Sequence, residues 1–165
     1  MRFLLVALLM MLWIPGEAAA RVVYEDGPFT VREVKDADKI VCKLEISMNM
    51  DGRIAAYLGL FRSSKYYGEL FTERRRIGQA RGKVTIGFDS EPPTKVKFVP
   101  DSPGMDTEWR WQYLDMTNPG QMLDNVARKR AMQVGFFNGK QNFSFTIPLK
   151  GSSKAVKRLK RCSRR

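Results

Sequence analysis

The sequence predicts a mainly β fold: an antiparallel β-sandwich or partly open barrel with one internal helix and a short C-terminal helix. Apolar and polar residues alternate over several short stretches, as expected for strands with one buried face. The pairs Asp51-Gly52 and Asn138-Gly139 each separate two such stretches, as in hairpin turns. Short strands joined in this way are typical of sandwiches and barrels.

The first clear strand pattern lies before Asp51-Gly52, and a second follows it. In both, every second residue is apolar and is expected to face the core: Ile40, Cys42, Leu44, Ile46, Met48, then Ile54, Ala56, Leu58, Leu60. Shorter alternating runs indicate three more strands: Val84, Ile86 and Phe88; Val96 and Phe98; Trp109, Trp111 and Tyr113. The last three fall on one face, a pattern that favours a sandwich core over the alternative of a carbohydrate-binding platform.

The two helices are expected late in the chain. Asn118 is a suitable N-cap and Pro119 suits the first helical position, so a helix of about three turns is predicted there. A hairpin around Asn138-Gly139 follows, and Ser152 or Ser153 can cap a final helix. Ala155, Leu159 and Cys162 share one side of that helix, and its basic residues lie largely on the other side.

The N-terminus indicates export. A positive start at Arg2 is followed by an apolar run over residues 3–14 and by small residues at 18–20, as in a secretory signal peptide. The run is too short to span a bilayer, so no transmembrane anchor is expected after cleavage. We divide the chain into a signal peptide (1–20), an N-terminal lead-in (21–38), a single β-rich domain (39–162) and a basic tail (163–165). The expected location is the periplasm or the medium.

The chain has two cysteines, Cys42 and Cys162. An even count in an exported domain favours one disulfide, although free or intermolecular thiols remain alternatives. The formal net charge of +12 predicts attraction to polyanions such as anionic cell-wall polymers, lipid headgroups or nucleic acid, with a merely solubilising basic surface as the alternative.

The order of these elements is similar to that of a known group. A strand with a cysteine comes early, a tryptophan-containing strand comes later, and the chain closes with Phe143, Phe145, Gly151, Ala155, Leu159 and Cys162 in a strand-helix-Cys pattern. This resembles the periplasmic accessory proteins associated with type VI secretion (the VasI/TagO-like group) and related envelope domains. The resemblance implies pairing of the early and final cysteines and gives no enzyme activity to carry over.

The search for catalytic groups is mostly negative. The chain contains no histidine, which excludes Ser-His-Asp and Cys-His catalysis and histidine metal sites. A Ser-Lys pair such as Ser153 and Lys157 is explained better by chance spacing, and carboxylates such as Glu25 and Asp26 lie in turn-like sequence and are expected to be solvated. We therefore expect no enzyme activity, no cofactor and no metal.

Two basic clusters are candidate contact surfaces. Arg74, Arg75 and Arg76 lie near Tyr66, Tyr67 and Phe71, and this mixture suits a nucleic acid or a glycan; a loop with inward aromatics is the alternative. The second cluster is on the last helix, with Lys157, Arg158, Lys160 and Arg161. The expected function is an exported, non-enzymatic accessory or binding module of the bacterial cell envelope, and the alternative is a basic secreted polyanion-binding protein. The expected partner is an envelope protein or an anionic envelope polymer, and the oligomeric state stays open.

Overall fold

The computed structural model describes residues 20–36, 39–61, 68–99, 104–105, 108–116 and 118–162. The signal peptide expected at 1–20, except for Ala20, and the tail expected at 163–165 lie outside the described residues, as do Tyr66 and Tyr67. The strands and helices of the described residues follow one another in this order: β1 (Arg21–Asp26), β2 (Phe29–Asp36), β3 (Lys39–Met50), β4 (Arg53–Phe61), β5 (Gly68–Glu73), β6 (Arg81–Phe88), β7 (Thr94–Phe98), β8 (Gly104–Met105), β9 (Trp109–Asp115), α1 (Pro119–Arg128), β10 (Ala131–Phe137), β11 (Asn142–Pro148) and α2 (Ser152–Cys162).

All these strands belong to one antiparallel sheet. Ten of them follow the order β1-β2-β3-β4-β5-β9-β7-β6-β10-β11, and β8 pairs with β9. The path begins at β1 and ends at β11 without closing into a barrel. The predicted mainly β antiparallel fold, with an internal helix and a short C-terminal helix, is confirmed.

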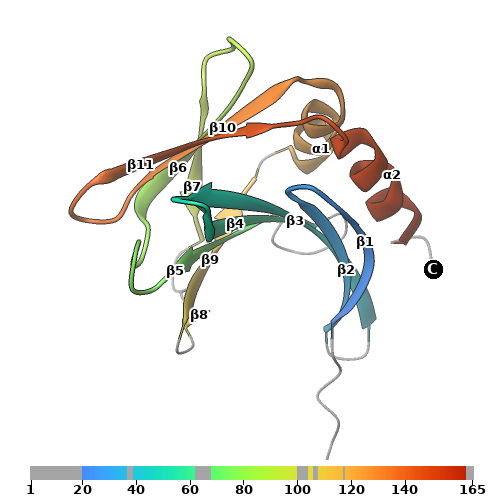
Figure 1. Cartoon of the computed structure of the whole chain (residues 1–165), viewed down its shortest axis with the longest axis horizontal. Helices are drawn as coiled ribbons and strands as arrows, with labels where there is room; N and C mark the ends of the chain where they lie inside the picture. The colour runs from blue at the N-terminus through green and yellow to red at the C-terminus, as the bar shows by residue number, and fades with distance from the viewer. Residues whose placement is uncertain are drawn as a thin grey trace, which may run out of the picture.

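The sheet is strongly bent around β3 and β4 (Figure 1). In that view β1 and β2 descend on one side of these two strands, and β5 and β9, with β8 paired to β9, descend on the other, so this part of the sheet forms an arch. Strands β6, β10 and β11 and both helices lie above the top of the arch. Helix α2 packs on β1, β2 and β3 and against α1, while β11 also approaches β3.

The hydrophobic core fills the space between the top of the arch and the elements above it. Alternation decides which side chains enter it, because every second residue of a strand points to the same face. On β3 these are Cys42, Leu44, Ile46 and Met48, all of which are buried as predicted. Ile40 lies at the start of the same strand and is 70 % exposed, which the sequence pattern did not indicate.

The N-terminal lead-in expected at 21–38 needs correction. Strands β1 and β2 fall within it and pair with each other, and β2 continues the sheet by pairing with β3 over residues 29–36. Phe29 and Val31 of β2 are fully buried in the core. The β-rich domain therefore begins at residue 21 and not at residue 39.

The predicted local signals hold. Met50 pairs with Arg53, and the two residues between them, Asp51 and Gly52, have φ angles of 52° and 75°, as a tight hairpin turn requires. The Asn118 side chain accepts a hydrogen bond from the Gln121 backbone N–H at 3.1 Å and so caps α1. Ser152 acts differently from the expected cap, because its hydroxyl donates to the Val126 carbonyl at 2.5 Å and ties α2 to α1.

A disulfide joins Cys42 of β3 to Cys162 at the end of α2, with the two Cα atoms 6.1 Å apart. The predicted pairing is therefore present, and it fixes α2 across the core face of β2 and β3.

Candidate functional site

The basic side chains of α2 form a continuous stripe. Lys154, Lys157, Arg158 and Arg161 follow the spacing i, i+3, i+4, i+7, which places them on one face of a helix. The opposite face holds Ala155, Val156 and Leu159, which are buried in the core. The stripe extends for about 10 Å at the rise of an α-helix. Within the part of the chain that the structure describes, no carboxylate forms an ion pair with any of these four side chains.

Lys160 has a different role from its neighbours. Its ammonium group lies 2.9 Å from the Asp124 carboxylate of α1, so this cation joins the two helices. The hydrogen bond from Lys160, together with its charge, lowers the pKa of Asp124. Of the four α2 residues proposed from sequence, Lys157, Arg158 and Arg161 thus lie on the stripe and Lys160 does not.

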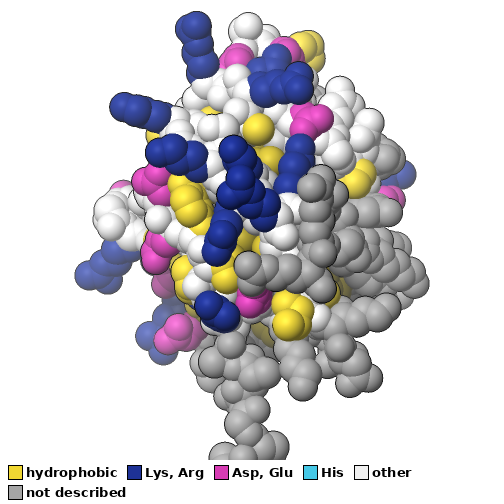
Figure 2. Space-filling model, turned by 90° about the vertical axis from the view of Figure 1, so that its right-hand side faces the viewer, with side chains coloured by type: hydrophobic (Ala, Val, Ile, Leu, Met, Phe, Trp, Pro, Cys, Tyr) yellow, Lys and Arg dark blue, Asp and Glu magenta, His cyan; other side chains and the backbone are white. Residues whose placement is uncertain are grey.

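The stripe dominates one side of the molecule. Figure 2 shows dark blue lysine and arginine side chains gathered on the side that carries α2, β1 and β2, with fewer acidic side chains between them. Arg158 and Arg161 also line a small cleft of about 230 Å³ together with Val23, Glu33 and the Cys162 end of the bridge. This side of the molecule is therefore a positively charged surface on a helix that the disulfide anchors.

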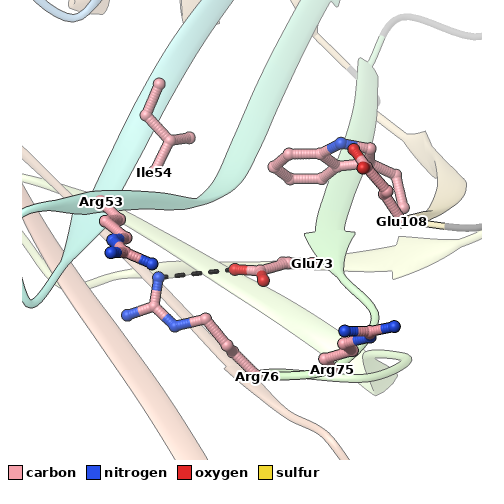
Figure 3. Close-up of a pocket in the computed structure, with 7 residues that line it drawn as sticks. Arg53, Ile54, Glu73, Arg75, Arg76 and Glu108 are labelled. Atoms are coloured by element: carbon pink, nitrogen blue, oxygen red, sulfur yellow. Dashed lines mark hydrogen bonds and ion pairs between the residues drawn. The ribbon is translucent and has the colours of Figure 1, made fainter.

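The arginines at 74–76 lie elsewhere. They belong to the turn after β5, on the opposite side of the molecule from α2 (Figure 1), so the two predicted clusters do not make one surface. Arg74 and Arg75 are exposed. Arg76 is half-buried: it donates to the Met50 carbonyl at 2.8 Å and pairs with Glu73 (Figure 3) and with Asp51, each at 3.4 Å. Its guanidinium therefore holds this turn against the β3–β4 hairpin.

The tryptophan strand corrects the sequence interpretation. Trp109, Trp111 and Tyr113 are half-buried and lie outside the hydrophobic core. Their register with β5 places them on the same sheet face as Phe71, and Phe71 is in register with Tyr57 of β4. That face is opposite to the one that packs against α2 and β11, so it is the inner surface of the arch.

The aromatic rings on this inner surface contact one another across three strands. The ring centroids of Tyr57 and Trp109 are 5.0 Å apart, and those of Phe71 and Trp111 are 6.2 Å apart. Alternation correctly predicted a shared face for the tryptophans. The side of the sheet on which that face lies depends on where the helices and the second half of the sheet pack, which the local pattern does not contain.

A network of four charged side chains runs beside the rings. Arg32 pairs with Glu45 at 2.7 Å, Lys43 pairs with Glu45 at 2.9 Å, and Lys43 also lies 3.4 Å from Glu69. The Lys43 ammonium is 4.6 Å from the centre of the Phe71 ring, a favourable cation–π distance. Gly59 leaves room for the network, since a Cβ there would lie 3.2 Å from the Lys43 side chain.

The two carboxyl groups of the network respond differently to their surroundings. Burial would raise the pKa of Glu45, but the charges and hydrogen bonds of Lys43 and Arg32 outweigh it and lower the pKa. Burial raises the pKa of Glu69, the single ion pair with Lys43 offsets it only in part, and the charge of Glu45 adds to the increase. Burial and the Glu45 charge also raise the pKa of Tyr57.

Two neighbouring clefts follow the inner surface. One, of about 490 Å³, is lined by Arg32, Glu45 and Ala20 and by four aromatic residues: Tyr57, Phe71, Trp109 and Trp111. The other, of about 480 Å³, is lined by Arg53, Ile54, Glu73, Arg75, Arg76 and Glu108 (Figure 3), and by Trp109, which lines both clefts. Sequence reasoning identified Arg75, Arg76 and the tryptophans, but it missed Arg32, Glu45 and Arg53 because they come from distant strands.

The described residues hold no group of three or more His, Cys, Asp or Glu side chains that could bind a metal ion. Glu25 and Asp26 are exposed, in agreement with the expectation that they are solvated. Among the helices of the described ranges, none has the length and apolar character to span a membrane.

Comparison with known proteins finds a similar fold among the solved structures. No family model matches the chain, and no curated protein matches it. The fold is similar to the crystal structure of invasion associated protein B from Bartonella henselae, with a TM-score of 0.57 over 86 % of this chain and 96 % of that one. The sequence identity is 11 %, so the likeness shows a shared fold and extends no function to this chain.

Proposed function

We propose that this protein is an exported, non-enzymatic binding module of the bacterial cell envelope, and that the basic stripe of α2 binds an anionic envelope polymer. The observation that carries this proposal is the arrangement of Lys154, Lys157, Arg158 and Arg161 along one exposed helix face. A linear polyanion can contact such a row with successive charged groups, and each contact adds to the attraction.

Folding alone does not account for the stripe. Cations near the C-terminus of a helix stabilise it through the helix dipole, but this effect falls off within the last turn. Lys160 and Arg161 are the basic residues of that turn, and Lys160 already pairs with Asp124. Lys154 lies in the first turn, where positive charge is unfavourable, and Lys157 lies in the middle of the helix, where the dipole gives it no stabilisation. Their presence there supports a role in binding.

Two features support export. The N-terminal sequence has the charge, apolar run and small residues of a signal peptide. The Cys42–Cys162 bridge suits an oxidising compartment, because disulfides are rare in reducing cytosol.

The proposal is tested by salt elution from immobilised heparin and by binding to lipopolysaccharide-containing vesicles. The variant K154Q/K157Q/R158Q/R161Q removes four charges of the stripe. The matched control K83Q/K95Q/K97Q/K140Q removes four exposed lysines of β6, β7 and the β10–β11 turn, so both variants have the same net charge.

We expect the stripe variant to elute at clearly lower salt than the control and to lose vesicle binding that the control keeps, since local charge density governs contact with a polyanion. Equal elution of the two variants would show that net charge alone causes retention, and the proposed role of α2 would be abandoned.

A further inference from the structure

The inner surface of the arch carries a second feature that the basic stripe does not explain. Four aromatic rings lie half-exposed in a row across β4, β5 and β9, although the core on the other face of the sheet is complete without them. Partly exposed aromatic side chains that line a cleft beside a few polar groups are common in binding sites. Their rings present flat faces with partial negative charge, which attract the C–H groups of a sugar ring.

Polar groups stand at the edge of these rings and are held in place. Arg32 and Glu45 line the same cleft; Lys43 holds Glu45 from the buried side of the network, and Glu69 in turn holds Lys43. A ligand therefore meets a guanidinium and a carboxylate whose positions are set before binding, which reduces the entropy lost on association. Flat rings beside fixed hydrogen-bonding groups suit the alternating C–H and hydroxyl faces of a saccharide.

The adjoining cleft has a small net positive charge, since three arginines and two carboxylates, Glu73 and Glu108, line it. Arg53 of β4 and Arg75 of the turn after β5 are exposed and lie around it (Figure 3), while Arg76 is already paired with Glu73. Trp109 lines both clefts, so a ligand stacked on the aromatic row continues directly towards the arginines. Arginine binds carboxylates through two parallel hydrogen bonds, which favours an acidic ligand at this end.

We propose that the two clefts together bind an acidic oligosaccharide, with its sugar rings on Trp109, Trp111, Tyr57 and Phe71 and a carboxylate on Arg53 and Arg75. Each cleft has a volume within the range of about 300–1,000 Å³ that is typical of small-molecule sites. This site is separate from the α2 stripe and does not depend on the proposed polymer binding.

The tryptophans provide a direct measurement. The chain contains three, Trp13, Trp109 and Trp111, and Trp13 precedes the described residues. A protein that begins at residue 21 contains every described strand and helix, and its tryptophan fluorescence reports only on the proposed site. The probes are tetragalacturonate and its methyl ester, which has similar sugar rings without the negative charges. Binding is followed by fluorescence and by calorimetry.

We expect tetragalacturonate to change the emission and to bind more tightly than its ester. W111A should weaken binding by roughly tenfold, and W111F should restore most of it because a ring is retained. R53Q/R75Q should weaken binding of the acid by roughly tenfold and leave binding of the ester unchanged. The α2 stripe variant and F137A, which removes an aromatic ring exposed elsewhere, should bind as the unmodified protein does.

Three results would overturn the proposal. The first is an absence of emission change and heat with millimolar tetragalacturonate. The second is equal affinity for the acid and the ester. Unchanged binding by W111A and R53Q/R75Q, with thermal melts that show both variants to be folded, would count in the same way. The third is concentration-dependent dimerisation of the unmodified protein that W111A abolishes, which would assign the aromatic row to contact with a second copy of the chain.

Discussion

At the scale of single residues, the ion network of the inner surface shows how position decides the state of a charge. Glu45 pairs with two cations and Glu69 with one. Burial raises the pKa of each carboxyl group, and the cations reverse this effect at Glu45 but not at Glu69. An ion pair in a poorly hydrated place stabilises a fold only when its partners compensate for the lost water. Glu45 meets that condition better than Glu69.

We expect E45Q to lower the free energy of unfolding at pH 7 by about 1.5–3 kcal/mol, because Arg32 and Lys43 lose their shared carboxylate. The folded-state pKa of Glu45 lies below its ordinary value of 4.5, so its stabilisation is present above pH 4.5 and is lost as the pH falls through the lowered value. Urea unfolding between pH 3 and pH 7 measures both effects.

E69Q and E25Q are the controls for this experiment. Glu69 has a raised pKa, so the contribution of its neutral form is present below pH 4.5 and is lost as the pH rises through the folded value, opposite in sign to Glu45. E69Q should therefore keep the acid-side loss of stability that E45Q reduces. Glu25 is exposed, and E25Q should change little. A similar loss of stability in E25Q and E45Q would contradict the assigned role of the network.

At the scale of elements, α2 is positioned by contacts on three sides. The bridge holds its C-terminal end, Lys160 joins it to α1, and the buried Ser152 hydroxyl attaches its first turn to the Val126 carbonyl. These contacts keep the apolar side of the helix on the core and the basic stripe facing away from it.

We expect S152A to lower the free energy of unfolding by about 1 kcal/mol, because a buried hydrogen bond between the two helices is lost. S153A is a closely matched control, since the neighbouring serine is exposed. It should change stability by only a few tenths of a kcal/mol. Thermal and urea unfolding of the pair test this, and equal losses in both variants would rule out a specific role for Ser152.

The elements also show what the sequence could predict. The β3–β4 turn and the start of α1 were predictable because their causes are local: two residues that tolerate positive φ, and an asparagine before a proline. Strand β5 was not predicted, because it is short and begins with glycine. On its core face Leu70 is the one large apolar side chain, and the next buried residue, Thr72, is polar. Strand β2 has a weak local signal, because only Phe29 and Val31 of its alternating positions are buried in the core.

The site was predictable in part for the same reason. The stripe follows from helical spacing within α2, so Lys157, Arg158 and Arg161 could be chosen from sequence alone. The pairing of Lys160 with Asp124 joins residues 36 positions apart, and the network of Glu45 joins three strands. Such partners depend on strand order, and the insertion of β9 between β5 and β7 has no local signal.

At the scale of the whole molecule, the disulfide connects residues 120 positions apart and so encloses most of the fold. A cross-link of this kind restricts the unfolded chain far more than the folded one. We expect C162S to lower the free energy of unfolding by about 2–5 kcal/mol. Dithiothreitol should reduce the stability of the unmodified protein to a similar value and leave C162S unaffected, as urea unfolding with and without reductant will show.

Serine is better tested at position 162 than at position 42, because Cys42 is fully buried among apolar side chains and a hydroxyl there adds its own desolvation cost. Equal stability of C162S and the oxidised protein would show that the bridge contributes nothing to the fold.

The position of the bridge also determines how the protein bears a mechanical load. A force applied between residue 21 and residue 162 passes through β1, β2 and the start of β3 and then across the disulfide. Residues 43–161 therefore carry no load. An extended chain spans at most about 3.5 Å per residue, so the distance between residues 21 and 162 can reach about 80 Å in the oxidised protein, bridge included, and about 500 Å in the reduced protein. Pulling single molecules with and without reductant measures the difference. Under tension between its ends the oxidised domain would thus keep residues 42–162 folded, including α2 and its basic stripe, while β1 and β2, with Arg32, would be pulled away.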